Sequence, residues 1–296
     1  MGFRVPLRRF IYKNNGLSGW FFRNFSTVDR DIMMHCLVNL STMNLKIIPC
    51  GTLKVHAGEM HNNLPVKRIP TFYEMDTEGY MRIAMNALLV DSGTKVVLFD
   101  PGCADFLPSR FVASYGLEIP VPLEQTLAEA GYETEQVTDV IFTHLHFDHG
   151  SGAFAREPGR ICKRFTNARY HVLKEHMEYA RKPDKGESNS FVTGFFKYLD
   201  SVHWLEDWKE DWMQYRVFNG HTRAMAVPGI KLQEEWIWYM TDLIPMESFL
   251  DPEVNSGYDL DPVLALQEKV DFLNILPEKS ELIFFHDTLT DRKFYP

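Results

Sequence analysis

Four side chains of metal-binding type lie within six consecutive residues, directly after an apolar run typical of a buried strand. They are His144, His146, Asp148 and His149, in the segment Thr143-His144-Leu145-His146-Phe147-Asp148-His149-Gly150. Imidazole nitrogen and carboxylate oxygen are ligands that zinc prefers. Alternate side chains of an extended chain share a face, so the first two histidines can hold one ion. Because Gly150 permits a sharp turn, the other two side chains can face a second ion.

Other apolar runs in the chain also end at a polar residue that can bind a metal or orient a metal ligand. These junctions are Phe99-Asp100, Thr241-Asp242 and Phe285-His286. Functional sites collect where strands end at one edge of a layered sheet. We therefore expect these polar side chains to lie near the 144–149 segment, although they are far from it in sequence.

The pattern His-x-His-x-Asp-His after an apolar strand resembles the signature of the metallo-β-lactamase superfamily. Gly220-His221-Thr222 resembles the Gly-His-Thr/Ser motif of that family, and Leu98-Phe99-Asp100-Pro101-Gly102 resembles its Asp-x-Gly element. The resemblance covers roughly residues 45–296. It implies an α/β fold, the four-layer αββα sandwich of the metallo-β-lactamase type.

The same resemblance implies a site for two zinc ions, with manganese, iron or cobalt as alternatives. The implied ligands are His144, His146 and His221 for the first ion, Asp148, His149 and His286 for the second, and Asp242 for both. A hydroxide that bridges the two metals then attacks the substrate. Asp148 and Asp242 are the predicted catalytic residues, since one orients the hydroxide and the other bridges the ions. Asp100 is expected to orient metal ligands from behind.

The stretches Asp242-Leu243-Ile244-Pro245 and Gly257-Tyr258-Asp259-Leu260-Asp261-Pro262 resemble the branch that holds the acyl-homoserine lactonases and methyl-parathion-hydrolase-like enzymes. This implies a metal-dependent hydrolase that cleaves a small ester or lactone. The alternatives are a phosphoester hydrolase acting on organophosphates or phosphodiesters, a non-catalytic metal-binding protein and a redox iron protein. Those lactonases carry a tyrosine shortly after the bridging aspartate, where this chain has Pro245 and Met246. Tyr258 is interpreted as a packed core aromatic, with a substitute role in the site as the alternative.

Composition narrows the class of partner. The formal net charge of −9 disfavours binding of polyanions over the whole surface, so a small-molecule substrate is expected rather than nucleic acid. No apolar run reaches about 18 residues, so no membrane-spanning helix is expected. The four cysteines show no C-x-x-C spacing, which favours buried thiols in a reducing, cytoplasmic location, with a disulfide as the alternative. A homodimer is compatible with all of these observations.

Residues 1–42 differ from the rest of the chain. They hold six basic and two acidic residues and resemble an organellar presequence. The alternative is a translated leader, with Met43 as the working start. We therefore predict a poorly ordered extension over 1–42 and the hydrolase domain over 43–296. If the extension acts as a presequence, the location is organellar instead of cytoplasmic.

Hydrophobic periodicity and turn residues predict alternating strands and helices after residue 43. Strands are expected at 45–49, 83–90, 94–99, 140–142, 236–241 and 282–285. Helices are expected at 123–130, 173–181, 191–199 and 263–276, and a polar loop at 182–190. His171, His176 and His203 lie outside the metal motifs and are predicted to be structural or exposed.

Overall fold

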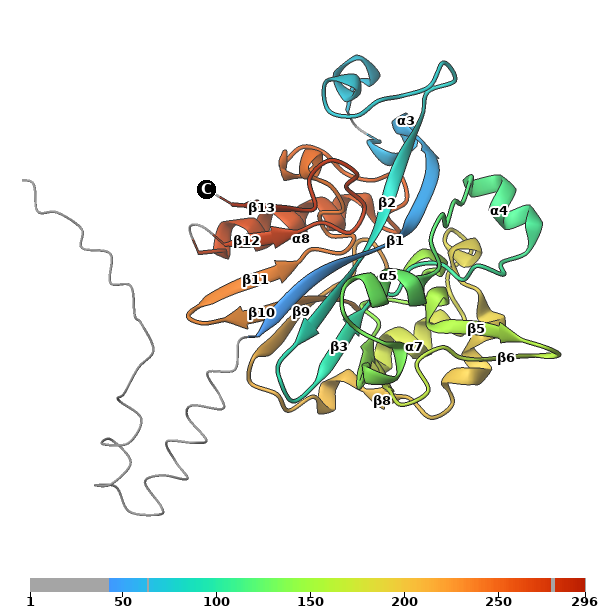
Figure 1. Cartoon of the computed structure of the whole chain (residues 1–296). Coiled ribbons are helices and arrows are strands. Elements are labelled where there is room, and N and C mark those ends of the chain that lie inside the picture. The colour runs from blue at the N-terminus through green and yellow to red at the C-terminus, as the bar shows by residue number, and fades with distance from the viewer. Residues whose placement is uncertain (1–42, 63, 278–279, 296) are drawn as a thin grey trace, which may run out of the picture. The chain divides into compact units, whose positions relative to one another are not determined.

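The computed structural model describes residues 43–62, 64–277 and 280–295. The predicted extension over 1–42 lies outside the described residues. Two sheets pack face to face and carry helices on their outer sides (Figure 1). The predicted four-layer α/β sandwich is therefore confirmed.

The first sheet has the strand order β1-β2-β3-β4-β7-β8. Its strands are β1 (Asn44–His56), β2 (Tyr80–Asp91), β3 (Val96–Phe99), β4 (Asp139–Ile141), β7 (Arg169–Val172) and β8 (His203–Trp204). β2 runs antiparallel to both β1 and β3, whereas β3, β4, β7 and β8 are parallel to one another. The carboxyl ends of the parallel strands therefore meet at one edge.

The second sheet has the order β13-β12-β11-β10-β9. Its strands are β9 (Met213–Phe218), β10 (Met225–Leu232), β11 (Glu235–Tyr239), β12 (Glu281–Ile283) and β13 (Arg292–Phe294). β11 and β12 are parallel, so the segments that follow them leave the sheet side by side. A separate hairpin pairs β5 (Phe154–Glu157) with β6 (Arg160–Lys163).

Contacts between the inner faces join the two sheets. The ring of Phe99 on β3 lies 6.2 Å from that of Tyr239 on β11, and the Tyr239 hydroxyl donates to the Asn86 carbonyl at 3.0 Å. The backbone N–H of Ala84 on β2 also donates to the His286 carbonyl at 3.0 Å. These links bring the segment after β12 against the first sheet.

Helices lie outside the sheets and in the connections between strands. The α-helices are α3 (Ala57–Met60), α4 (Ser109–Tyr115), α5 (Leu123–Glu129), α6 (Phe147–Gly150), α7 (Lys174–Ala180) and α8 (Pro262–Ile275). The 3-10 helices are η1 (Val66–Thr71), η2 (Thr134–Gln136), η3 (Ser151–Ala153), η4 (Ser188–Ser190), η5 (Thr193–Leu199), η6 (Leu205–Asp207) and η7 (Glu247–Leu250). Figure 1 shows α5 and α7 beside the first sheet and α8 beside the second.

The longest helix, α8, has a clear start and a clear packing face. The Asp261 side chain caps it by accepting from the Leu264 N–H at 3.0 Å, and Pro262 occupies the first turn, where its missing N–H has no cost. Its Phe272 ring lies 5.5 Å from Phe218 on β9 and 4.9 Å from Trp238 on β11. α8 therefore covers the outer face of the second sheet.

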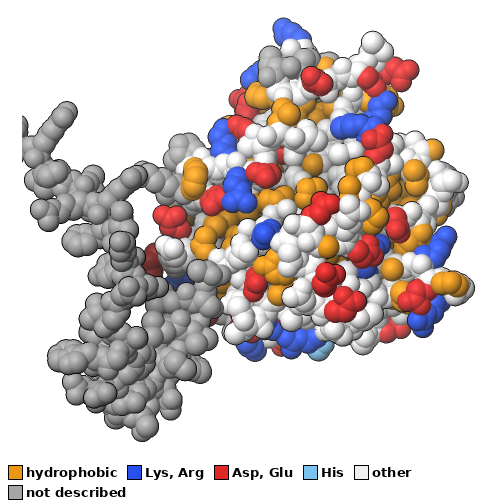
Figure 2. Space-filling model, in the orientation of Figure 1, with side chains coloured by type: hydrophobic (Ala, Val, Ile, Leu, Met, Phe, Trp, Pro, Cys, Tyr) orange, Lys and Arg blue, Asp and Glu red, His pale blue; other side chains and the backbone are white. Residues whose placement is uncertain are grey.

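The expected helix over 191–199 is wrong in type. The chain forms the 3-10 helix η5 there, with Phe195, Phe196 and Leu199 buried. Gly194, near the start of this segment, has a low propensity for the α-helix. The local conformation is therefore set by the burial of the aromatic side chains. Among the residues that the structure describes, no helix has the length and apolar character needed to cross a membrane. On the face in Figure 2, acidic and basic side chains are interspersed.

Candidate metal centre

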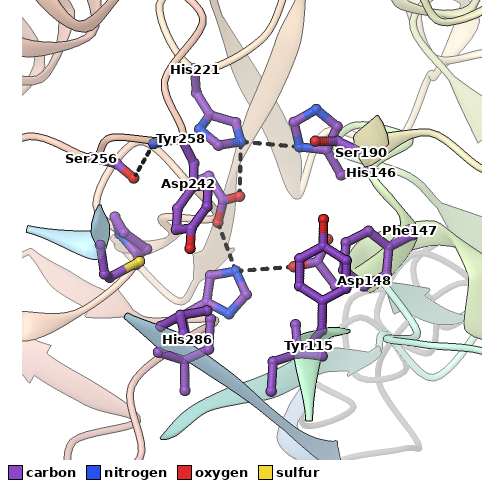
Figure 3. Close-up of a pocket in the computed structure, with 15 residues that line it drawn as sticks. Tyr115, His146, Phe147, Asp148, Ser190, His221, Asp242, Ser256, Tyr258 and His286 are labelled. Atoms are coloured by element: carbon purple, nitrogen blue, oxygen red, sulfur yellow. Dashed lines mark hydrogen bonds and ion pairs between the residues drawn. The ribbon is translucent and has the colours of Figure 1, made fainter. Parts of the chain in front are cut away.

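The seven predicted ligands come from the ends of four strands. His144 and His146 follow β4, and Asp148 and His149 stand in the first turn of α6. The remaining three follow β9, β11 and β12, and they are His221, Asp242 and His286. Figure 3 shows members of this set facing one another across one cavity. The structure thus brings all seven side chains together, at the expected strand ends.

Two of these strand ends turn through unusual backbone conformations. Thr241, just before Asp242, has a φ of +48°, and Asp100, just after β3, has a φ of +45°. Non-glycine residues rarely adopt this left-handed region, and a β-branched residue such as threonine does so least readily. Such strain is concentrated at functional sites, where it fixes a side chain in one direction. Here the turn at Thr241 aims the Asp242 carboxylate into the cavity.

The first donor group consists of His144, His146, His221 and Asp242. Their ligand atoms all lie within 4.8 Å of one another. His221 Nε2 lies 3.2 Å from His146 Nδ1 and 3.0 Å from Asp242 Oδ2. His144 Nε2 lies 3.5 Å from the same carboxylate oxygen. Three nitrogens and one oxygen therefore face a common centre.

The second donor group consists of Asp148, His149 and His286, whose ligand atoms also lie within 4.8 Å of one another. His286 Nε2 is 3.6 Å from Asp148 Oδ2 and 3.3 Å from Asp242 Oδ1. His149 Nε2 is 3.2 Å from Asp242 Oδ2. Asp242 therefore contacts both groups, and its two oxygens lie between them.

Unpartnered polar atoms inside this cluster fit a bound cation. His144 Nε2, His149 Nε2 and Asp242 Oδ1 are buried and have no hydrogen-bond partner within the described part of the chain. A buried polar atom without a partner costs about 1–3 kcal/mol. Nitrogen lone pairs and a carboxylate that converge in this way match the donors of a divalent zinc site. The residues present therefore fit the metals that the sequence motifs imply.

Each of the five imidazoles in the cluster is held from behind through its other ring nitrogen. The partners are Thr143 Oγ1 for His144 (3.1 Å), Glu187 Oε2 for His146 (3.2 Å), Asp100 Oδ2 for His149 (3.1 Å), Asp259 Oδ1 for His221 (3.0 Å) and the Ala84 carbonyl for His286 (2.8 Å). A hydrogen bond at one ring nitrogen fixes the tautomer and leaves the other nitrogen free for a metal. The cluster is therefore oriented before any ion binds.

Burial and the Asp242 charge set the protonation of the histidines in the metal-free chain. Burial, together with neighbouring histidine charges, holds the pKa of His144 well below its usual range. Burial also lowers the pKa of His146 and of His286. Burial opposes protonation of His221, but Asp242 raises its pKa to about 10. A metal ion that bound at neutral pH would therefore have to displace a proton from His221, whereas His144 would offer an unprotonated nitrogen.

Three residues of the site were missed by sequence reasoning alone. Glu187 is buried although it lies in the predicted polar loop, and no spacing or motif singles it out. Asp259 was part of a stretch singled out for its resemblance, so its position after Tyr258 was an available signal. Tyr115 ends α4 and lines the cavity. The structure alone identifies Glu187 and Tyr115.

The cavity above the cluster has largely apolar walls. Its lining beyond the ligands is Leu53, Val55, Met60, Ile83, Tyr115, Phe147, Ser190, Pro245, Ser256 and Tyr258. The interpretation of Tyr258 as a core residue is wrong, because it is 40% exposed and lines this cavity (Figure 3). The loop that carries it docks on α3, where the Gly257 N–H donates to the Glu59 carbonyl at 2.8 Å. That docking holds Tyr258 at the cavity instead of in the core.

The remaining histidines have the structural or exposed positions expected of them. His176 accepts from the Leu145 N–H at 2.8 Å, and its other nitrogen lies 2.6 Å from the Arg223 carbonyl. It therefore joins the central motif to the segment after His221. His171 is buried, whereas His203 is largely exposed.

Comparison with known proteins identifies the fold. The family model of the metallo-beta-lactamase superfamily matches residues 83–229. A protein described as a probable metal-dependent hydrolase from Staphylococcus aureus is 18% identical, with 86% of this chain and 92% of that chain covered and a TM-score of 0.77. AidC, a dizinc quorum-quenching lactonase, is 20% identical, with 85% and 90% covered and a TM-score of 0.71. The hydrolase AbOPH is 19% identical, with 86% and 90% covered and a TM-score of 0.68.

No curated protein matches the sequence. The matched family segment contains β4, the 144–149 motif and His221, while Asp242 and His286 lie beyond it. The fold brings Asp242 and His286 next to the histidines and the aspartate of the matched segment. The chain belongs to the metallo-β-lactamase superfamily of metal-dependent hydrolases.

Proposed function

We propose that the chain hydrolyses a small, uncharged ester or lactone at a centre that holds two zinc ions. The first donor group would hold one ion, and Asp148, His149 and His286 the other. The observation that carries this proposal is the place of Asp242, whose two oxygens lie 3.0 Å from His221 Nε2 and 3.3 Å from His286 Nε2. Two such ions, when bound, supply a hydroxide at neutral pH and polarise the substrate oxygen.

Asp148 is the ligand best placed to exchange a proton with the substrate. Its side chain is 13% exposed and lines the cavity, whereas the side chains of His144 and His149 are fully buried. A carboxylate that touches both the second donor group and the cavity can orient the attacking hydroxide and pass its proton to the leaving oxygen. Asp242 holds both donor groups at a fixed separation.

The cavity walls favour an uncharged substrate. Among the described residues that line the cavity, none is a lysine or an arginine. Enzymes that bind phosphodiesters place cationic side chains on the phosphate oxygens. Leu53, Val55, Met60 and Phe147 instead present aliphatic and aromatic surface, which suits an acyl chain or another apolar substituent. This supports an ester or lactone over a phosphodiester or nucleic acid.

Two phenols complete the cavity. Figure 3 shows Tyr115 and Tyr258 on either side of the space between His286 and Asp148. Burial, and after it the charge of Glu59, raises the pKa of Tyr258, so this phenol keeps its proton at neutral pH. In the structure its hydroxyl donates to Glu59 Oε2 at 3.3 Å, so it would have to rotate away from Glu59 to donate a hydrogen bond to a carbonyl or a leaving oxygen of the substrate.

A substrate screen joined to metal analysis tests the proposal. The chain is stripped with a chelator, reloaded with zinc, manganese, iron or cobalt, and assayed on lactones, carboxylic esters, phosphotriesters and bis-phosphodiesters. We expect two metal ions per chain, and hydrolysis of lactones or esters that returns on reloading. Turnover of phosphotriesters alone would move the assignment to organophosphates, which are also uncharged. A metal-loaded chain that cleaves no ester or lactone contradicts the proposal.

A further inference from the structure

Glu187 occupies an unusual place for a residue of an exposed loop. Its side chain is only 4% exposed, although its neighbours Gly186 and Ser188 are exposed. Its Oε2 lies 3.2 Å from His146 Nε2, and its Oε1 accepts from Thr222 Oγ1 at 3.1 Å. One buried carboxylate therefore contacts both the central histidine motif and the residue after His221.

This contact decides which nitrogen of His146 can bind a metal. His146 Nδ1 faces His221 Nε2 at 3.2 Å, whereas Nε2 faces the Glu187 carboxylate. A carboxylate only accepts hydrogen bonds, so it keeps the proton on Nε2 and leaves the lone pair on Nδ1. His144 and His286, by contrast, are held by the uncharged oxygens of Thr143 and Ala84.

The segment that carries Glu187 also forms part of the cavity wall. Phe191 makes an isolated β-bridge to His146, and its ring lies 4.8 Å from the imidazole. Ser190, between these two contact points, lines the cavity. The metal ligand and this part of the wall are therefore held by the same short stretch of chain.

We propose that Glu187 is a positioning residue of the metal centre: it fixes His146 as an Nδ1 ligand and ties the 187–191 wall to that ligand. This inference rests on the proposed function, since it requires that the first donor group binds a metal. A carboxylate behind a metal-bound histidine makes it a stronger ligand, and removal of such a partner typically lowers metal affinity by about 10–100-fold.

The test measures zinc affinity without substrate. Metal-free unmodified chain, Glu187→Ala and Glu187→Gln are titrated with zinc in competition with a chromogenic chelator, and folding is checked by circular dichroism. Asp184→Asn is the matched control, because it removes an exposed carboxylate from the same loop. Spectra of the cobalt-loaded proteins report the ligand geometry independently of activity.

We expect Glu187→Ala to bind one of the two ions about 10–100-fold more weakly, with an altered cobalt spectrum. Glu187→Gln should lose less, since its amide oxygen still accepts from Nε2, and Asp184→Asn should match the unmodified chain. Zinc affinity within twofold of the unmodified chain in folded Glu187→Ala overturns the inference. If Glu187→Ala does not fold, the same criterion applies to Glu187→Gln. If the unmodified chain binds no zinc, the proposed function itself fails.

Discussion

Buried histidine and aspartate side chains gather near both ends of β4, yet the two groups differ in how many of their polar atoms have hydrogen-bond partners. At the start of the strand Asp139 is fully buried and has a complete set of donors. These donors are Thr138 Oγ1 (2.8 Å), His171 Nε2 (2.8 Å), Arg169 Nε (3.1 Å) and Lys95 Nζ (3.2 Å). Beyond the other end of the strand lie the two donor groups, in which His144 Nε2 and His149 Nε2 have no hydrogen-bond partner among the residues that the structure describes.

This difference distinguishes a structural cluster, at the start of β4, from a candidate binding site at its other end. The Asp139 cluster, defined as Asp139 and its four donors, joins the starts of β3, β4 and β7 and needs no further cation. The two donor groups contain three buried atoms without a hydrogen-bond partner in the described chain, His144 Nε2, His149 Nε2 and Asp242 Oδ1, which a cation would satisfy. Burial and charge alone would not distinguish the two ends, whereas a count of unpartnered atoms does.

The largest effect on activity is expected from a substitution in the two donor groups. Replacing Asp242 by asparagine removes the only carboxylate that contacts both donor groups in the described chain. We expect loss of at least one of the two bound metals and a fall in hydrolysis on the order of 10³-fold, since a metal contributes several kcal/mol to the transition state. Metal content by mass spectrometry and the ester or lactone assay measure this. A variant that retains two metals and full activity contradicts the role given to Asp242.

A substitution in the Asp139 cluster should lower the free energy of unfolding and leave the metal content unchanged. Asp139→Asn leaves Lys95, Arg169 and His171 without their shared carboxylate, and breaking a buried ion pair costs about 3–5 kcal/mol. We expect a loss of about 3 kcal/mol in the free energy of unfolding, measured by urea denaturation, with zinc stoichiometry unchanged. If this variant lost zinc instead, the distinction between the structural Asp139 cluster and the candidate metal site would be wrong.

At low pH, protonation of Asp139 should remove the stability that the Asp139 cluster contributes. Burial opposes ionisation, but His171, Thr138 and Lys95 lower the pKa of Asp139 to about 2 from its usual value of 3.8. A lowered folded-state pKa contributes stability that is present above pH 3.8 and lost as the pH falls towards 2. The stability gap between the unmodified chain and Asp139→Asn should therefore narrow as the pH falls from about 4 towards 2. A gap that stays constant over this range contradicts the assignment.

The smallest effect is expected at the cavity mouth. Tyr258→Phe removes one hydroxyl that we propose contacts the substrate, and a hydrogen bond is worth about 1 kcal/mol. We expect kcat/KM for the ester or lactone to fall by about five- to tenfold, with metal content unchanged. Tyr215→Phe on the edge strand β9 is a matched control, because Tyr215 does not line the cavity. Equal activity of the two variants would limit Tyr258 to a packing role.

The fold could be predicted because the histidine and aspartate motifs resemble those of a known family, and the convergence of the ligands because several apolar runs end at a polar residue. Apolar runs that end at Asp242 or His286 predict strands that deliver a ligand, and parallel β11 and β12 place those ends together. Glu187 could not be predicted, since its burial arises from the fold of a polar loop onto His146 and no periodicity marks it. Tyr258 was misassigned because a tyrosine in a loop has the same sequence signature whether it packs in the core or faces a cavity.

The partners behind the five imidazoles have a consequence for the purified protein. Because the donor atoms are oriented in advance, the two donor groups would offer the same nitrogen and oxygen ligands to any metal ion. Such a mixture does not by itself select among divalent transition metals, whose affinities follow a common order. The metal recovered from a culture should therefore follow the composition of the growth medium, and preparations from different media should differ in catalytic rate while sharing one structure.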